Sequence, residues 1–228
     1  MAQENKLKRK DLKEPDQFLV ASNEFLDFLA RNKTSLLVVL VVILAVAGGF
    51  LFVSDQRQSQ NMKMETLYHQ MSRLVGEAKD SPDEDLLSKL KSLYDKFDKG
   101  DQKLRAGLIL ADFQYQNKNY EGALSAFQEV AEGAPAGTLN FNLAQAGIAH
   151  SYESKKDFNK AVSHYKKIID MPGEYPLFHT YLGLARCYEL SGDTKNALLI
   201  LREMQNKFPK HPGLEKVDLT LKRLEGSA

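Results

Sequence analysis

Residues 119–130 read NYEGALSAFQEV, with a small alanine at position 123 between two aromatic residues. The stretches DFNKAVSHYKKI, 157–168, and DTKNALLILREM, 193–204, repeat the pattern. In each stretch alanine is the fifth residue, and a large apolar residue follows four places later. The alanines, which are 38 and 36 residues apart, are Ala123, Ala161 and Ala197. A period in this range predicts a solenoid of stacked structural repeats.

Three repeat units can be written around these alanines: 104–135, 142–173 and 178–209. Each unit has an apolar stripe of helical period, a short polar turn and a second such stripe, which predicts a pair of antiparallel helices. A small residue stands 12 places before each alanine, at Ala111, Ala149 and Ala185. Helix axes approach to about 8–10 Å where small side chains meet. These alanines therefore predict the contact within each pair, with Phe127 filling the widening gap one turn on.

The order of these residues resembles the tetratricopeptide repeat family. The second unit shows the pattern most fully, in Ile148-Ala149, Tyr152, Phe158, Ala161 and Tyr165. The early tryptophan of the family is missing, because Gly107 and Gln145 stand in its place and Tyr181 is the nearest match. The resemblance implies a right-handed helical solenoid, with three tetratricopeptide-like repeats over 104–210.

The segments on either side of these repeats are also predicted to be helical, so the expected fold class is all-α. Residues 55–103 are interpreted as a degenerate helical repeat, whose second helix begins near Ser81 and ends at Gly100 in a left-handed conformation. Residues 211–228 carry apolar residues on one side and charges on the other. They are predicted to form the capping helix that an open solenoid needs.

Charge and cysteine content exclude some classes of protein. The chain has 228 residues, with 31 basic and 30 acidic residues and a net charge of +1. Such a balance argues against general binding to nucleic acid, which needs a basic field over the phosphates. The single cysteine, Cys187, can form no disulfide within the chain. We interpret it as a small core residue.

Residues 34–54, TSLLVVLVVILAVAGGFLFVS, form a run of 21 residues without a charge. As a helix rising about 1.5 Å per residue, the run spans roughly the 30 Å hydrocarbon core of a bilayer. A buried core helix and a cleaved signal peptide are the alternatives, and AVA at 45–47 resembles a small-residue cleavage site. Because 33 residues precede the run and it continues past that site, we predict an uncleaved single-pass transmembrane anchor.

Residues 1–33 contain seven Lys and Arg residues. By the positive-inside rule this segment is predicted to be a cytoplasmic tail, with residues 55–228 on the other side of the membrane. The part over 14–30 is predicted to be an amphipathic helix that lies at the membrane or docks on a membrane partner. The alternative is a helix that simply continues into the anchor. The apolar stripe supplies our candidate contacts with a membrane partner: Phe18, Phe25 and Leu29.

No catalytic motif stands out. The sequence has no phosphate-binding loop, nucleophile elbow or paired-cysteine motif, and its five histidines lack the spacing of metal ligands. We therefore expect no enzyme activity, metal, cofactor or small-molecule substrate. What remains is protein binding.

In the family that this sequence resembles, the first helix of each repeat lines a concave groove. By register, the groove candidates are Leu108, Asp112, Tyr115, Ala146, His150, Glu153, Leu182, Arg186 and Glu189. The alternative is that these residues form ordinary solvated surface. The family's Lys and Asn positions that clamp a terminal carboxylate hold other residues here, so recognition of a free C-terminus is not expected.

The whole layout resembles the YfgM-like family of bacterial inner-membrane proteins. The stretch KEPDQFLVASNEFLDFLARNK, 13–33, carries this likeness together with the anchor and the repeats. The resemblance implies a single-pass protein of the bacterial inner membrane with a periplasmic C-terminal domain. Its implied partners are the Sec translocon, periplasmic chaperones or exported chains. The alternative hypothesis is a structural or regulatory adaptor of envelope assembly or cell division.

Overall fold

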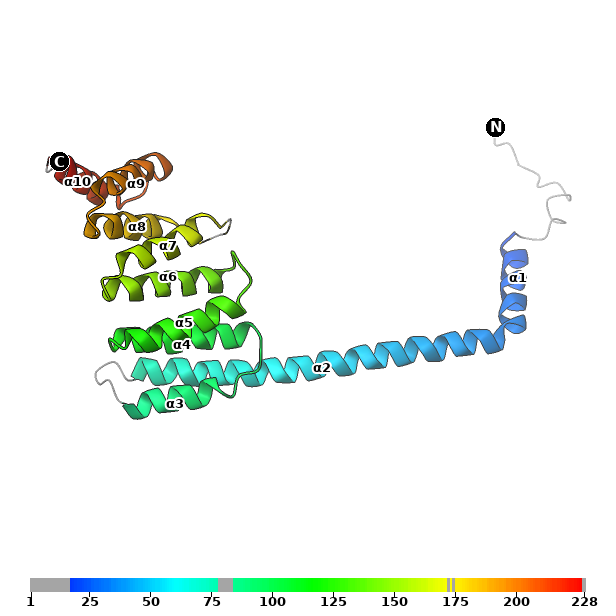
Figure 1. Ribbon diagram of the computed structural model, residues 1–228. Coiled ribbons are helices and arrows are strands. Elements are labelled where there is room, and N and C mark those ends of the chain that lie inside the picture. Colours follow the sequence, from blue (N-terminus) through cyan, green and yellow to red (C-terminus); the bar gives the residue numbers. More distant parts are fainter. Residues whose placement is uncertain (1–16, 78–83, 172, 174, 227–228) are drawn as a thin grey trace, which may run out of the picture. The chain divides into compact units, whose positions relative to one another are not determined.

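The computed structural model describes residues 17–77, 84–171, 173 and 175–226, without the side chains of 17–21 and 84. The described residues contain helices and no strand, which confirms the all-α prediction (Figure 1). They divide into two compact units, Met1–Gln60 and Asn61–Ala228. The helix start predicted near Ser81 and the basic residues before residue 17 lie outside the described residues.

The first unit contains α1 (Gln17–Arg31) and the whole uncharged run, 34–54, of α2 (Lys33–Glu77). A single turn residue, Asn32, separates the two helices, and its side-chain amide donates to the carbonyl of Phe28 at 3.0 Å. The predicted amphipathic segment is therefore a helix of its own. From Lys33 onward α2 is unbroken, so the predicted anchor and the first helix of the degenerate repeat form one helix.

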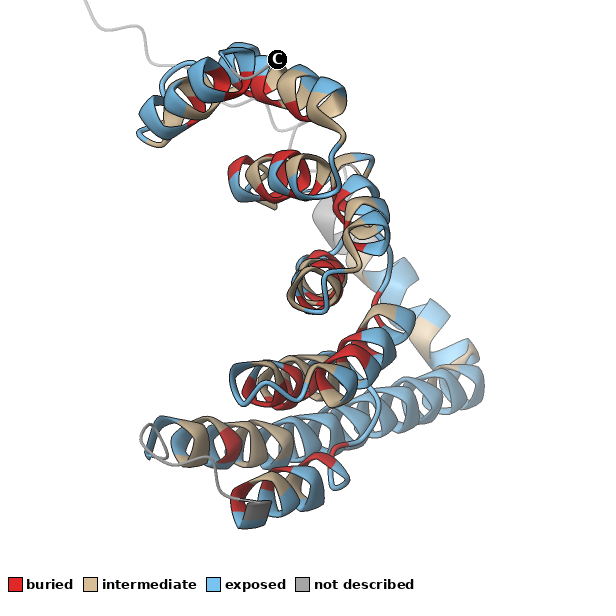
Figure 2. Cartoon of the chain, turned by 60° about the vertical axis from the view of Figure 1, so that its left-hand side comes forward, coloured by how far each residue is buried: buried red, intermediate tan, exposed pale blue. Residues whose placement is uncertain are grey.

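The second unit is a series of helix pairs. After the C-terminal part of α2 come α3 (Glu84–Tyr94), α4 (Asp101–Gln116), α5 (Tyr120–Gly133), α6 (Leu139–Ser154), α7 (Phe158–Ile169), α8 (Phe178–Leu190), α9 (Thr194–Lys207) and α10 (Leu214–Glu225). The pairs α4–α5, α6–α7 and α8–α9 correspond to the three predicted repeats. Figure 2 shows their buried residues on the sides where successive helices meet.

The turns inside the three repeats share one backbone feature. An Asn or Asp side chain caps each second helix, and the residue directly before this cap adopts a left-handed conformation. That left-handed residue is Lys118 (φ 61°), Lys156 (φ 62°) or Gly192 (φ 83°). The turn geometry is thus the same in all three repeats, although only the third has a glycine there.

The predicted alanine contacts are confirmed. Ala111, Ala123, Ala149, Ala161, Ala185 and Ala197 are all buried. The large residue after the second-helix alanine also packs on the following repeat. A Cβ atom added at Gly147 would lie 2.4 Å from the ring of Phe127, and one added at Gly183 would lie 2.6 Å from the ring of Tyr165. An aromatic ring of the preceding repeat therefore packs directly against a glycine of α6 and against one of α8.

Two predictions concern the helices on either side of the repeats, and only the first is wrong. The helix predicted to end at Gly100 ends at Tyr94 instead, and Phe97 is buried from the connecting loop. Gly100 (φ 140°) is the residue that precedes α4, so its unusual backbone starts a helix and ends none. At the other end, α10 buries Val217 and Leu221 against the α8–α9 pair, as expected of a cap.

Candidate protein-binding surface

All but one of the first-helix residues chosen by register line hollows on the second unit. One hollow, named here the α4–α6 hollow, lies between α2, α4 and the start of α6 and includes Leu108 and Asp112. The α6–α8 hollow includes Tyr115, His150 and Glu153. Leu182 and Glu189 line a third hollow between α8 and α10, and Arg186 lines both of the last two.

Two groups of candidates stand apart from these hollows. Ala146 lines none of the hollows described above and packs against the core cluster around Ala149 and Ala161. Of the membrane-helix candidates, Phe25 is exposed on α1, Leu29 is half-buried, and the side chain of Phe18 lies outside the described residues. Their roles in binding stay predictions.

Several candidates are joined to the neighbouring repeat. Arg186 of α8 donates two hydrogen bonds to the carboxylate of Glu153 on α6, one of them at 2.8 Å. The hydroxyl of Tyr165 donates to the same carboxylate at 3.2 Å and lies 3.0 Å from Nδ1 of His150. Two residues predicted to line the groove, Glu153 and Arg186, therefore also connect repeats two and three.

This arrangement sets the charge of Glu153. Burial disfavours its charged form, but the hydrogen bonds from Arg186, together with the nearby imidazole of His150, outweigh burial and lower the pKa of Glu153 to about 2. The hydrogen bonds that Arg186 donates to Glu153 in turn raise the pKa of Arg186 above its ordinary value. Glu153 and Arg186 are consequently both charged across the physiological range, and their charges are engaged with each other.

Equivalent links occur at the neighbouring positions. Glu189 accepts a hydrogen bond from Arg223 of α10 at 2.8 Å, and the hydroxyls of Tyr115 and Ser154 lie 3.0 Å apart. Sequence reasoning missed Ser154 and Arg223. The signal that could have found Arg223 is its spacing, because both Glu–Arg pairs join residues 33 or 34 apart, close to one repeat.

Asp112 differs from these candidates. It accepts a hydrogen bond at 2.6 Å from the neutral amide of Gln116, one turn further along α4. No ion pair to Asp112 is found among the described residues. Desolvation by the surrounding protein raises the pKa of Asp112, with the hydrogen bond from Gln116 opposing the rise. Its negative charge therefore has no counter-charge in the repeat unit as described.

The α4–α6 hollow also contains apolar side chains that sequence reasoning did not select. Leu139 and Leu143 stand one turn apart on α6, and they are 60% and 37% exposed. Exposed apolar surface of this kind is available for contact with a partner. No periodic pattern pointed to these two residues, because they lie outside the stripe that packs the helix pair.

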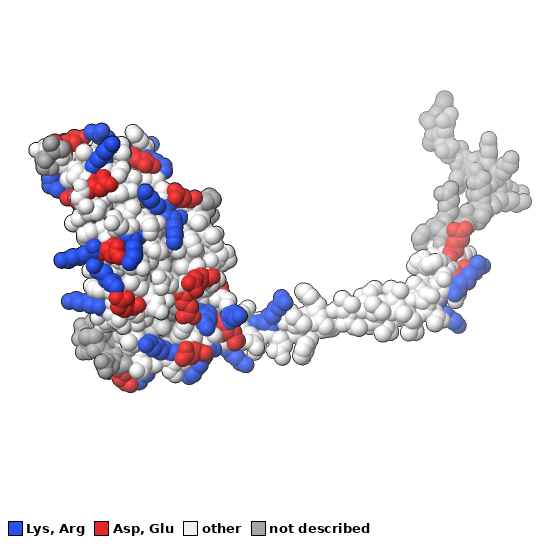
Figure 3. Space-filling model, in the orientation of Figure 1, with Lys and Arg blue, Asp and Glu red and all other residues white. Residues whose placement is uncertain are grey.

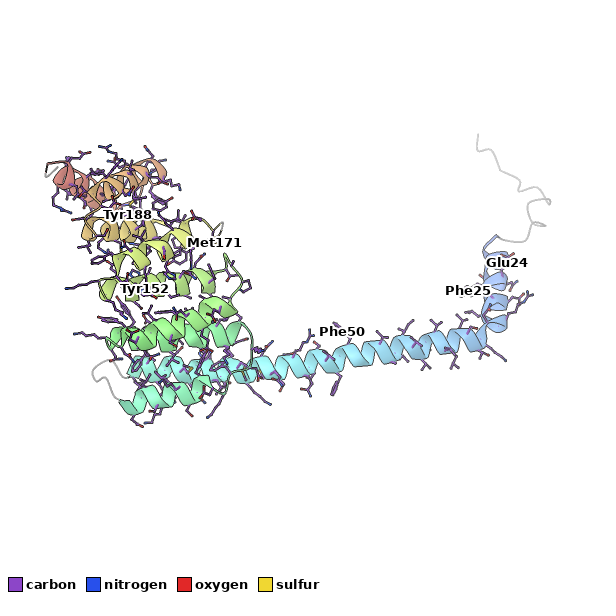
Figure 4. All side chains as sticks on the ribbon, in the orientation of Figure 1. Glu24, Phe25, Phe50, Tyr152, Met171 and Tyr188 are labelled. Atoms are coloured by element: carbon purple, nitrogen blue, oxygen red, sulfur yellow. The ribbon has the colours of Figure 1, made fainter. Side chains whose placement is uncertain are left out.

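The apolar part of α2 is exposed as well. α2 is long and apolar enough to cross a membrane, and no residue of its most apolar window is buried. Figure 3 shows this part of the helix without charged side chains, whereas basic and acidic residues are interspersed over the second unit. Figure 4 labels Phe50, whose side chain points outward from the helix. Within the described residues, no cluster of His, Cys, Asp and Glu could hold a metal ion.

Comparison with known families identifies the repeats. The chain matches the tetratricopeptide repeat-like domain over residues 27–172, which is more than half of its length. The chain belongs to the tetratricopeptide repeat-like family. Residues 179–211, which hold α8 and α9, also match the tetratricopeptide repeat itself. The longer match begins within α1, so it includes the apolar run as well as the first two repeats.

Solved structures agree on the fold. A Podosopora anserina protein assigned as a kinesin light chain, with nearly identical TPR-like repeats, is 15% identical, with a TM-score of 0.57. The match covers 71% of this chain and 85% of that one, and a variant of the same protein gives the same score over 84% of its chain. No curated protein sequence matches. Tetratricopeptide repeats are generally non-catalytic scaffolds, so the family indicates a protein-binding scaffold.

Proposed function

We propose that this chain is a membrane-anchored scaffold that binds proteins at the outer surface of the bacterial inner membrane. The observation that carries the proposal is the exposed apolar run of α2, which continues directly into the repeat unit. The hydrocarbon core of a bilayer would bury an apolar surface of this length. Anchoring would hold the repeats at the membrane, where their effective concentration toward membrane partners is high.

The partners we propose are the Sec translocon together with periplasmic chaperones or exported chains. Support comes from the resemblance of the tail, anchor and repeats to YfgM-like proteins, and from the family match that spans the apolar run. The exposed apolar residues of α1, Phe25 among them, would contact the translocon, and the hollows of the repeat unit would remain free for chaperones or clients.

Orientation can be tested with protease. Protease added to intact spheroplasts should digest the repeat unit and leave a short membrane-bound fragment, because seven basic residues precede the anchor. Lysed spheroplasts serve as the control for protease access. Full protection of the repeats in intact spheroplasts, with digestion after lysis, would place them in the cytoplasm and reject the proposal.

Partners can be tested by photocrosslinking in living cells. A photoreactive residue would be placed at His150 in the α6–α8 hollow and at Phe25 on α1, with the exposed Leu199 of α9 as a control position. The proposal expects adducts with translocon subunits from Phe25 and with chaperones or exported chains from His150. Adducts confined to proteins of wall synthesis or division would reject the translocon and favour the adaptor hypothesis.

A further inference from the structure

The α4–α6 hollow combines open space, apolar side chains and unbalanced negative charge. It has a volume of about 520 Å³, and Leu108, Leu139 and Leu143 contribute to its lining. Leu139 and Leu143 leave a large part of their apolar surface exposed to solvent. Asp101 and Asp112 stand near the two ends of the hollow along α4.

The charges of the hollow do not balance. Asp101 accepts a hydrogen bond from the amide of Asn140 at 2.7 Å, and Asp112 accepts one from Gln116, so the partner is neutral in both cases. The one guanidinium in the lining belongs to Arg105, which already stacks 4.1 Å from the ring of Tyr68 and lies 3.7 Å from a carboxylate oxygen of Glu65. Arg105 also interacts electrostatically with Asp101, so the lining keeps an excess of one negative charge, at Asp112.

We propose that the α4–α6 hollow binds a segment of a partner protein in which large apolar side chains are flanked by Lys or Arg. This inference rests on the proposed function, and it names the chemistry of the segment. The leucines would bury the apolar side chains, and the two carboxylates would pair with the basic ones. An anionic lipid surface does not fit this site, because its phosphates would face carboxylates.

The geometry also sets the spacing of the basic residues. Asp101 and Asp112 are eleven residues apart on one helix, which corresponds to about 16 Å. An extended chain rises about 3.3 Å per residue. Two basic residues roughly five positions apart, with apolar residues between them, would reach both carboxylates.

The test measures binding of two labelled synthetic peptides to the full chain in detergent micelles by fluorescence anisotropy. The first peptide has about ten residues, with two lysines five positions apart around a pair of leucines. The second peptide has glutamates in place of the lysines. The proposal expects at least tenfold weaker binding of the acidic peptide, and rising salt should weaken binding of the basic one. Equal binding of the two peptides, or none, would overturn it.

Paired variants locate the site. Asp112→Asn should weaken binding of the basic peptide about two- to fivefold, as loss of an exposed ion pair does. Its control is Asp218→Asn, since Asp218 likewise accepts a hydrogen bond from a glutamine amide, at 2.7 Å. Leu139→Asn should weaken binding about tenfold. Its control is Leu219→Asn on α10, because Leu219 is 62% exposed. Both controls should bind as the unchanged chain does, and circular dichroism checks that every variant is folded.

Other outcomes separate this inference from the proposed function. If Asp112→Asn and Leu139→Asn bind like the unchanged chain while photocrosslinking still captures partners, the inference fails and the scaffold function stands. If photocrosslinking captures nothing from either site, the proposed function fails. A dimer that Leu139→Asn converts to a monomer, as measured by analytical ultracentrifugation, would show that a second copy occupies the hollow and would overturn the proposal.

Discussion

Two interfaces between repeats can be compared: the first seam, between α5 and α6, and the second seam, between α7 and α8. They have the same packing but different polar contacts. In both, a ring from the second helix of one repeat lies on a glycine of the next repeat, Phe127 on Gly147 and Tyr165 on Gly183. The first ring has no hydroxyl. The second has one, which donates to Glu153 and thereby joins the core to an ion pair at the surface.

Neighbouring repeats can therefore differ in their polar surface contacts while the packing between them stays the same. Shape complementarity between ring and glycine sets the spacing of the repeats at both seams. The polar residues at the edges then decide which parts of the surface are occupied. Next to the second seam, Glu153 and Arg186 form an ion pair, whereas Asp112 on α4 has only a neutral hydrogen-bond partner.

The largest expected effect comes from replacing Gly147 or Gly183, each of which packs against an aromatic ring, with alanine. Gly147→Ala should lower the free energy of unfolding by about 1–3 kcal/mol, because its new methyl group would overpack a buried ring. Gly183→Ala should cost more than Gly147→Ala, since the hydroxyl of Tyr165 is held by Glu153, to which it donates a hydrogen bond, and by Nδ1 of His150 at 3.0 Å. Urea unfolding of the full chain in micelles, followed by circular dichroism, measures both.

The matched control for these two substitutions is Gly76→Ala on α2. A Cβ at Gly76 would have no atom within 4 Å, so this change should be neutral or stabilise the helix by up to about 1 kcal/mol. If Gly147→Ala proves as harmless as Gly76→Ala, the rings do not set the spacing of the repeats.

A smaller effect is expected from the ion pair at the second seam. Glu153→Gln should lower the free energy of unfolding by about 1–2 kcal/mol, because it removes the charge of a carboxylate that is only 14% exposed and that pairs with Arg186. Ser154→Ala, which removes the hydroxyl partner of Tyr115, should cost only about 0.5–1 kcal/mol. Equal losses for the two variants, again from urea unfolding, would contradict the difference drawn between the charged and the neutral contact.

The pH dependence of stability tests the same carboxylate. The pKa of Glu153 is lowered from 4.5 to about 2 in the folded chain. The stabilisation that its charge provides is therefore complete above about pH 4.5 and is lost as the pH falls from there toward 2. The Glu153→Gln chain should lose less stability over this window than the unchanged chain does. Parallel pH profiles of the two melting temperatures would show that Glu153 is not held in its charged form.

A single substitution, Tyr165→Phe, should make the second seam resemble the first. Tyr165→Phe keeps the ring on Gly183 and removes the hydroxyl, so it should cost about 1 kcal/mol. Because the lost hydrogen bond ends on Glu153, its effect and that of Glu153→Gln should not add. A double-mutant cycle by urea unfolding measures this coupling. Additive losses would show that the hydroxyl and the ion pair act separately.

Much of the fold could be predicted from single residues. The alanines at Ala123, Ala161 and Ala197 predicted helix pairs, because close helix contacts tolerate only small side chains. The structure places these alanines in the core. The end of α3 was mispredicted at Gly100, since a glycine with positive φ can precede a helix as well as end one. Local sequence does not distinguish these two positions.

The candidate surface was harder to predict. Register selected Leu108 and Asp112 as groove candidates, and both line one hollow of the structure. Register could not show that Leu139 lies in the same hollow, because that contact depends on how α6 stacks on α4. It also could not show that Glu153 is engaged by Arg186, 33 residues further along the chain.

The sequence by itself determined the helix pairs, their period, the cap and the uncharged run of 21 residues. These features follow from local periodicity and side-chain size, which act over one or two helical turns. Only the tertiary structure decided which exposed side chains share a hollow and which charges are paired. Neighbouring repeats bring together residues more than 30 positions apart, and small differences in stacking determine which of them meet. Asp112 and Glu153, two acidic residues on the first helices of neighbouring repeats, therefore differ in charge balance for reasons outside their own helices.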